Sequence, residues 1–279
     1  MLYPFLAVIF DVLTLISTKR IFVKFKNLDY KSFAWWLFFW IAGVGLLVSP
    51  WFVTIQSTAT QPHYLWLLLA LVFLAANYNL LFYFGLKYEK VSEIEPFLLF
   101  NPLIAIVIAS LFFPGERSWH VYLAAAVAGL ALAWSHLDRQ HLKLSRPLLA
   151  ILGFALLHGL EAVIIKELLM VYSPLALYLV RCITTALFLW VIEKGKIKKI
   201  TLQQVPFFLL IAVGALVTSV LIYTSYHGIG ISMTMAVLLL SPILVYLLSV
   251  LYLREKLQWK NIVSSVVIIG AIIWLSVVR

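Results

Sequence analysis

Two stretches decide the fold: NPLIAIVIASLFFPGERSWHVYLAAAVAGLALAW at residues 101–134 and SPILVYLLSVLYLREKLQWKNIVSSVVIIGAIIW at residues 241–274. They align at an offset of 140 residues, which is half the length of this 279-residue chain. Leucine matches mean little in so apolar a sequence, but proline and tryptophan matches are harder to obtain by chance, and they indicate a duplicated unit. The matched pairs are Pro102 with Pro242, Trp119 with Trp259 and Trp134 with Trp274.

The composition is that of an integral membrane protein. Hydrophobic residues make up 64% of the chain, charged residues make up 11%, and the mean hydropathy is +1.06, whereas a soluble domain is about one-quarter charged. Basic residues at helix ends that face the cytoplasm and anionic lipid explain the net charge of +10, so we expect the lipid bilayer as a partner and no nucleic acid. Cys182 is the only cysteine, which excludes an internal disulfide and a thiolate metal site. We expect no metal and no cofactor.

Apolar segments long enough to cross a bilayer, about 20 residues each, recur along the whole chain. They predict an all-α integral membrane protein with ten transmembrane helices and no soluble domain. The first apolar stretch has no basic n-region and no small-residue cleavage site, so we interpret it as a retained helix. The predicted helices are 2–25, 32–53, 63–86, 92–113, 117–136, 147–171, 174–193, 204–227, 230–253 and 259–277.

Basic residues are distributed unevenly between the two predicted faces. Nearly all of the 21 lysines and arginines fall in the odd-numbered connections, which share one face. Arg117, Lys166 and Arg279 are on the other face. The positive-inside rule makes the crowded face cytoplasmic and places both termini outside. We therefore expect a multi-pass protein of the cytoplasmic cell membrane, from a bacterium or an archaeon.

The repeat and the charges together predict an inverted pair of units. In residues 1–139 the basic connections are the first and third of the unit, and in residues 140–279 they are the second and fourth. Each unit has five helices, an odd number, so the second copy enters the membrane upside down. Inverted-topology repeats of this kind are typical of secondary transporters, which make two alternating gates from two related halves.

Both matched segments resemble the repeat ending of EamA-type members of the drug/metabolite transporter superfamily. The shared features are an Asn-Pro or Ser-Pro in an apolar helix, a short Gly-Glu-Arg-like turn, and a final helix that carries glycine. Glu116 and Glu255 lie in the two turns, and Arg254 replaces the usual glycine in the second. Arg181 falls where the family often carries an arginine. The resemblance implies a ten-helix basket that exports amino acids, metabolites or drugs. It also implies that both termini lie in the cytoplasm, whereas the distribution of lysines in this sequence predicts that both lie outside.

Three ionisable residues are expected near the middle of the bilayer, where each charge costs on the order of 2.5–3.5 kcal/mol. Asp11 and Glu161 lie roughly 21 Å, and Arg181 roughly 18 Å, from the cytoplasmic ends of their helices. One interpretation is a substrate site, in which Arg181 holds a carboxylate and Glu161 or Asp11 holds an amine or cation. The alternative is an Arg181–Glu161 pair that only neutralises itself. His158 shares a face with Glu161 and either joins the site or satisfies a backbone carbonyl.

Two polar and aromatic pairs repeat in the predicted third and eighth helices. Asn79 and Tyr83 are four residues apart, and Ser219 and Tyr223 repeat that spacing 140 positions later. Because the units are inverted, the first pair is expected toward the cytoplasmic side and the second toward the outside, which suits the two gates of an alternating-access pathway. Alternatively, the tyrosines belong to the interfacial aromatic belts.

The two matched prolines are candidate hinges. Pro102 and Pro242 fall near the middle of their predicted helices, where proline removes one backbone donor and kinks the helix. They either let each half rock or act as static bends. Small residues between Ala124 and Gly129 allow close helix contact, within the bundle of a monomer or across a homodimer.

These observations favour a secondary transporter, an exporter or facilitator that moves small metabolites such as amino acids and related zwitterionic solutes by alternating access. A flippase for a lipid-linked sugar and an intramembrane lipid-modifying enzyme are the alternatives. The sequence has no phosphate-cradling P-loop and no G-x-S-x-G motif, so we expect no catalytic residues. A closed polar cup around Arg181 would favour small solutes, a greasy lateral slot would favour lipid, and a catalytic dyad would favour an enzyme.

Overall fold

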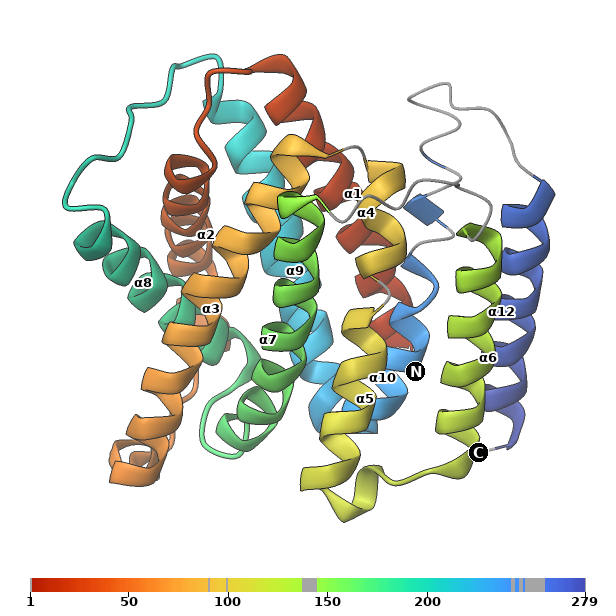
Figure 1. The fold of residues 1–279 in the computed structure, drawn as a ribbon. Helices are drawn as coiled ribbons and strands as arrows, with labels where there is room; N and C mark the ends of the chain where they lie inside the picture. Colours follow the sequence, from red (N-terminus) through yellow and green to blue (C-terminus); the bar gives the residue numbers. More distant parts are fainter. Residues whose placement is uncertain are drawn as a thin grey trace.

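A computed structural model describes residues 2–89, 91–98, 100–136, 145–241, 244–245, 248 and 259–278. The described chain is helical throughout, apart from one isolated antiparallel bridge between Ile55 and Tyr172. Figure 1 shows the helices as a single bundle. They are α1 Leu2–Lys24, α2 Tyr30–Phe52, α3 Pro62–Tyr88, α4 Val91–Leu98, α5 Phe100–Phe112, α6 Trp119–His136, α7 Arg146–Leu168, α8 Pro174–Ile192, α9 Val205–Ile229, α10 Ile231–Leu238 and α12 Trp259–Val278, with short 3-10 turns η1 Ser57–Thr60 and η2 Pro114–Glu116.

The helices begin where the sequence supplies caps and prolines. The Asp29 carboxylate accepts hydrogen bonds from the first backbone N–H groups of α2, and the Ser145 hydroxyl accepts one from the start of α7. These side chains satisfy donors that have no partner inside the helix. Proline has no N–H to leave unsatisfied, so it suits the first turn. It stands there in four helices, as Pro62, Pro147, Pro174 and Pro206.

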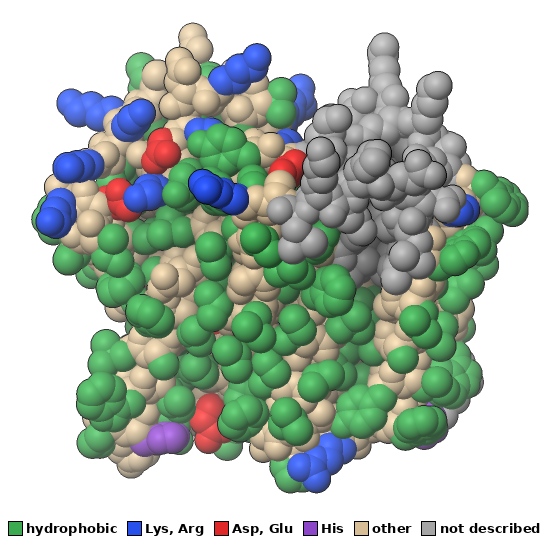
Figure 2. All heavy atoms as spheres, viewed as in Figure 1, with side chains coloured by type: hydrophobic (Ala, Val, Ile, Leu, Met, Phe, Trp, Pro, Cys, Tyr) green, Lys and Arg blue, Asp and Glu red, His purple; other side chains and the backbone are tan. Residues whose placement is uncertain are grey.

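Five of the described helices are long and apolar enough to cross a membrane: α2, α3, α7, α8 and α9. The prediction of an all-α membrane protein is therefore confirmed. The predicted spans at 92–113 and 230–253 correspond, in the described residues, to the shorter helices α4, α5 and α10. Charged side chains gather at one end of the molecule, the upper end in Figure 2, above a broad hydrophobic band. Both chain ends lie in the lower part of the same view (Figure 1).

Helices from the two halves of the chain pack against one another. The largest contacts join α3 to α7, α1 to α9, α6 to α12, α5 to α7 and α2 to α8, and α6 and α12 stand side by side at one edge of Figure 1. Glycines bring two of these pairs close together. A Cβ at Gly85 of α3 would lie 2.4 Å from Ile151 of α7, and a Cβ at Gly214 of α9 would lie 2.5 Å from the Thr14 hydroxyl of α1. Small residues at such crossings are typical of membrane bundles.

Candidate functional site

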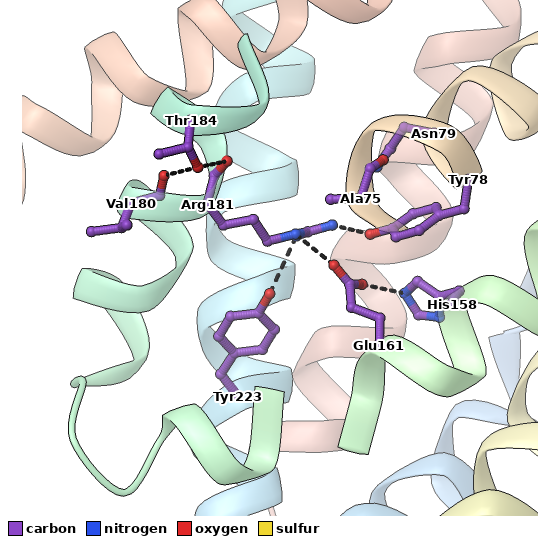
Figure 3. A network of polar contacts seen from close by, with 9 residues as sticks. All are labelled: Ala75, Tyr78, Asn79, His158, Glu161, Val180, Arg181, Thr184 and Tyr223. Atoms are coloured by element: carbon purple, nitrogen blue, oxygen red, sulfur yellow. Dashed lines mark hydrogen bonds and ion pairs between the residues drawn. The ribbon is translucent and has the colours of Figure 1, made fainter. Parts of the chain in front are cut away.

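Two of the predicted intramembrane charges form a buried ion pair at the centre of the bundle. Arg181 Nε of α8 lies 2.8 Å from Glu161 Oε1 of α7, and the side chains are 7% and 1% exposed. The side chains point toward each other across the gap between the two helices (Figure 3). Neither residue faces the outside of the bundle. An arginine buried at this depth is stable only with a partner, because its charge has left water.

Tyrosines complete the surroundings of the guanidinium. Arg181 Nη1 donates a hydrogen bond to the Tyr223 hydroxyl at 3.2 Å, and Nη2 donates one to the Tyr78 hydroxyl. The ring of Tyr178, one helical turn before Arg181, lies 5.5 Å from the guanidinium carbon. The two terminal guanidinium nitrogens are therefore hydrogen-bonded, while Nε is paired with Glu161 by charge and donates no hydrogen bond among the described residues.

His158 joins the same network from α7. Its Nε2 lies 4.0 Å from Glu161 Oε2, and its Nδ1 lies 2.9 Å from the side-chain oxygen of Asn101 on α5. The ring also packs edge-on against Tyr78, with ring centroids 5.0 Å apart. The described partner of His158 is thus a side chain, and the histidine connects Glu161 to the helix that carries Pro102.

Asp11 lies on the other side of the same space. Its Oδ2 accepts a hydrogen bond from the Ser241 hydroxyl at 3.3 Å. Among the described residues it has no ion-pair partner within 4 Å. Asp11 is therefore held by one neutral contact, whereas Glu161 is paired with an arginine.

A cavity of about 190 Å³ lies between α1, α2, α3, α7, α8 and α9. All eight residues that the sequence singled out as substrate-binding line it, together with aromatic side chains from the same helices. The eight are Asp11, Asn79, Tyr83, His158, Glu161, Arg181, Ser219 and Tyr223.

A second cavity of about 230 Å³ adjoins the first and reaches toward α5 and α10. The two cavities share Asp11, His158 and Ser219, among other residues. Pro102 lines the second cavity, and Pro242 lies outside the described residues. Helix α10 ends at Leu238. In a continuous helix the Leu238 carbonyl would accept a hydrogen bond from the N–H of residue 242, and proline has no N–H to donate.

The two predicted gate pairs border one cavity. Asn79 and Tyr83 line it from α3, and Ser219 and Tyr223 line it from α9. The Asn79 amide donates to a carbonyl of its own helix at 2.8 Å, while Tyr223 binds Arg181 directly. The pairs are thus parts of one central chamber, with Tyr223 closest to the ion pair.

Sequence reasoning missed several members of the site. Tyr78 precedes Asn79 and lies in the 140-residue register with Thr218, which also lines the cavity. Tyr178 is three residues before Arg181 and so shares its helix face. Asn101, which contacts His158, is the residue before Pro102, as Ser241 is the residue before Pro242. The repeat offset and the helical spacing were the signals that could have found them.

A second polar cluster connects the turn η2, which carries Glu116, to residues in the second half of the chain. The buried carboxylate of Glu116 accepts hydrogen bonds from the backbone N–H groups of Ile231 and Ser232, both at 2.9 Å, and pairs with Lys166. Burial raises the pKa of Glu116, but the hydrogen bonds from Lys166 and from the start of α10 outweigh burial and lower it. Gly230 is held at φ +89°, and a Cβ there would lie 2.6 Å from the carboxylate. We call Glu116, Lys166, Ile231 and Ser232 the Glu116 latch. Glu255 lies outside the described residues.

The described helices thus enclose a polar chamber with a buried ion pair inside an apolar bundle. Residues 145–277 match the model of the EamA-like transporter family. The resemblance noted from the sequence is therefore confirmed over these residues, which match the transporter domain of the drug/metabolite transporter superfamily.

The fold is also found among solved structures. One of them, described only as "Crystal structure of protein", superposes with a TM-score of 0.72 at 16% sequence identity, over 99% of this chain and 96% of its own. At that identity the likeness shows the fold alone. No curated protein matches the chain in sequence.

Proposed function

We propose that this protein is a secondary transporter that moves a small amine-bearing organic solute, a class that includes amino acids and related zwitterions, across the cytoplasmic membrane by alternating access. The observation that carries the proposal is the chamber itself. It holds a charge pair and several tyrosines in the middle of a bundle whose outer surface is apolar. Intramembrane charges that line a cavity mark a solute pathway by default.

The proposal includes two units, 1–139 and 140–279, with inverted topology. Helix packing supports an exchange of the two halves. Two units related by a twofold axis should make equivalent contacts. The axis would exchange α1 with α7 and α3 with α9, so that the packing of α3 on α7 corresponds to the packing of α9 on α1, and both contacts exist. Under the same exchange the pairs α2–α8 and α6–α12 each map onto themselves. An odd number of helices per unit then requires a pseudo-twofold axis in the membrane plane.

The lining of the chamber favours a small solute over a lipid and transport over catalysis. The walls present hydroxyl, carboxylate, imidazole and guanidinium groups from several helices, which suit a solute that is polar at one end. The closest charged contact, between Arg181 and Glu161, joins an acid to a permanent cation. Such a pair lacks the nucleophile and base that a hydrolytic dyad needs.

Export from cells that express the intact protein tests the proposal. We expect a screen of amine-bearing solutes to find at least one whose export depends on the protein. That export should be lost in Arg181→Ala and kept in Arg146→Ala, which removes an exposed arginine at the start of α7. Unchanged export in Arg181→Ala would reject the site, and the absence of any exported solute would reject transport.

A double variant separates the functional interpretation from a pair that only neutralises itself. Arg181→Ala alone leaves Glu161 buried without a cation, and such a charge destabilises a protein strongly. Arg181→Met with Glu161→Gln removes both charges and keeps similar volumes. We expect this variant to insert into the membrane and to lose transport. Normal transport in it would show that the pair serves only packing.

A further inference from the structure

The chamber offers two charged groups to a solute, and they differ in how free they are. Arg181 donates hydrogen bonds from its two terminal nitrogens to Tyr223 and Tyr78, and its Nε lies 2.8 Å from Glu161 Oε1 in an ion pair without a hydrogen bond. A substrate carboxylate would have to displace one of these buried partners and would leave it unpaired, which is costly. Arg181 is therefore a poor receptor for an anion.

Asp11 is the charged group of the chamber that has no ion-pair partner among the described residues. It lines both cavities, and among the described residues its only hydrogen bond comes from the neutral Ser241 hydroxyl. The charges of Arg181 and Glu161 cancel, so an ionised Asp11 leaves the walls with one negative charge in excess. An uncompensated carboxylate away from bulk water gains most from a cation.

The walls beside Asp11 suit an apolar or aromatic body. Phe82, Phe154 and Ile222 line both cavities, and the two phenylalanine rings lie 4.9 Å apart between centroids. Aromatic faces attract organic cations in addition to burying apolar surface. The Thr218 hydroxyl, on a side chain that is 6% exposed, has no hydrogen-bond partner among the described residues and adds a polar group to the shared wall.

From these contacts we infer that the solute is an organic cation, a primary amine with an aromatic or branched apolar body, and that Asp11 recognises its charge. Arg181 is then a positioning residue, which holds Glu161 and the tyrosines in place. The inference rests on the proposed function and narrows it, because a carboxylate on the solute gains nothing from Arg181 and is repelled by Asp11.

The affinities of the protein for three matched ligands test this inference, and this measurement does not depend on transport. 2-Phenylethylamine, phenylalanine and 3-phenylpropionate share a ring and a short chain and carry a cation, a zwitterion and an anion. Calorimetric titration of the detergent-solubilised protein should show the amine bound at least tenfold more tightly than either of the others. Equal or tighter binding of phenylalanine or phenylpropionate, or no binding of the amine, would overturn the inference.

Variants of Asp11 test whether this residue causes the preference for the amine. Asp11→Asn should lower the affinity for the amine at least tenfold, and Asp11→Glu should keep it within a few-fold. Glu193→Gln removes a carboxylate that pairs with Lys31 outside both cavities and should leave the affinity unchanged. If Asp11→Asn does not fold, the ligand comparison and Asp11→Glu decide the matter. Undiminished amine binding in Asp11→Asn rejects the assignment.

The result is separable from the transport test. A protein that prefers the amine but exports no solute keeps this inference and loses the proposed function. A protein that exports phenylalanine and shows no preference for the amine keeps the proposed function and loses this inference.

Discussion

Asn101 and Ser241 stand 140 residues apart at matching positions of the repeat, and each contacts the first helix of the other half of the chain. Asn101 Oδ1 lies 2.9 Å from His158 Nδ1 on α7, and the Ser241 hydroxyl lies 3.3 Å from Asp11 Oδ2 on α1. Each of them directly precedes a proline. The two Xaa-Pro motifs thus place equivalent polar side chains against the two titratable residues that the cavities share.

This arrangement predicts paired effects of removing the two side chains. Asn101→Ala frees the His158 ring, and Ser241→Ala removes the only described hydrogen bond to Asp11. Because a neutral hydrogen bond contributes about 0.5–1.5 kcal/mol, we expect each variant to raise the KM for export about two- to tenfold with little loss of folded protein. Ser110→Ala, which removes a hydroxyl bonded to its own helix, is the control. Wild-type kinetics in both variants would show that these contacts do not shape the site.

Breaking the central ion pair on one side should destabilise the protein. Glu161→Ala leaves the Arg181 charge 6% exposed without its carboxylate, and loss of one partner of a buried pair costs about 3–5 kcal/mol. We expect a fall of several degrees in the melting temperature of the detergent-solubilised protein. The Arg181→Met, Glu161→Gln double variant should recover most of that loss. A single variant as stable as the wild type would mean that water reaches the pair.

The helices and eight residues of the site were predictable because both depend on the polarity of single residues. Asp11, Glu161 and Arg181 stand out in apolar helices, and a charge in that setting must be buried against a cavity or a partner. The 140-residue offset further paired Asn79 with Ser219 and Tyr83 with Tyr223, and all four residues line the chamber.

The partners within the site were not predictable, because they depend on how helices cross. Nothing along α3 distinguishes Tyr78, which binds Arg181, from Tyr83, which packs edge-on against Phe33 with ring centroids 4.9 Å apart. The choice depends on how α3 packs against α7, which the sequence of α3 alone does not determine. The Glu116 latch also escaped prediction, since the turn motif marked the glutamate but not the start of α10 as its partner.

The Glu116 latch predicts a pH-dependent stability. In the folded protein the pKa of Glu116 is lowered, so ionised Glu116 stabilises the fold. This contribution is fully present above the ordinary glutamate pKa of 4.5, and it is lost as the pH falls through the lower folded value. Glu116→Gln should therefore lower the melting temperature at pH 7, by a loss of about 1–3 kcal/mol, and the difference from wild type should shrink below pH 4.5.

Glu167→Gln is the control for the latch, because Glu167 is adjacent to Lys166 but makes no described side-chain hydrogen bond or ion pair. It should leave the melting temperature at pH 7 unchanged. A Glu116→Gln difference that is the same at pH 7 and at low pH would contradict the role of the charge.

Close helix crossing at Gly85 predicts a sharp cost for one added methyl group. The Cβ in Gly85→Ala would lie 2.4 Å from the Ile151 side chain and 3.1 Å from the Pro147 carbonyl, so either the buried Ile151 side chain must shift or α3 and α7 must separate. Overpacking of this kind costs about 1–3 kcal/mol. Gly43→Ala adds the same methyl group to α2, where nothing lies within 4 Å, and should be neutral or slightly stabilising. Equal melting temperatures for the two variants would disprove tight packing at the α3–α7 crossing. Ile151→Ala should cost less stability in the Gly85→Ala background than in the wild type, because the added methyl group fills part of the space that it leaves.

The orientation of the chain predicts which connections a reagent reaches from each side of the membrane. Replacement of Cys182 by serine gives a background without cysteine, into which single cysteines are introduced at two exposed positions. Ser57 lies in the connection between α2 and α3, and Lys196 lies in the basic connection between α8 and α9. By the positive-inside rule we expect a membrane-impermeant maleimide added to whole cells to label Ser57→Cys. Lys196→Cys should be labelled only after the membrane is opened. The reversed labelling pattern would place the basic face outside and both termini in the cytoplasm, because connections on the same face are separated by two helices.

Labelling of both positions from one side would contradict the inverted repeat. The connection between α2 and α3 and the connection between α8 and α9 would then lie on the same face of the membrane.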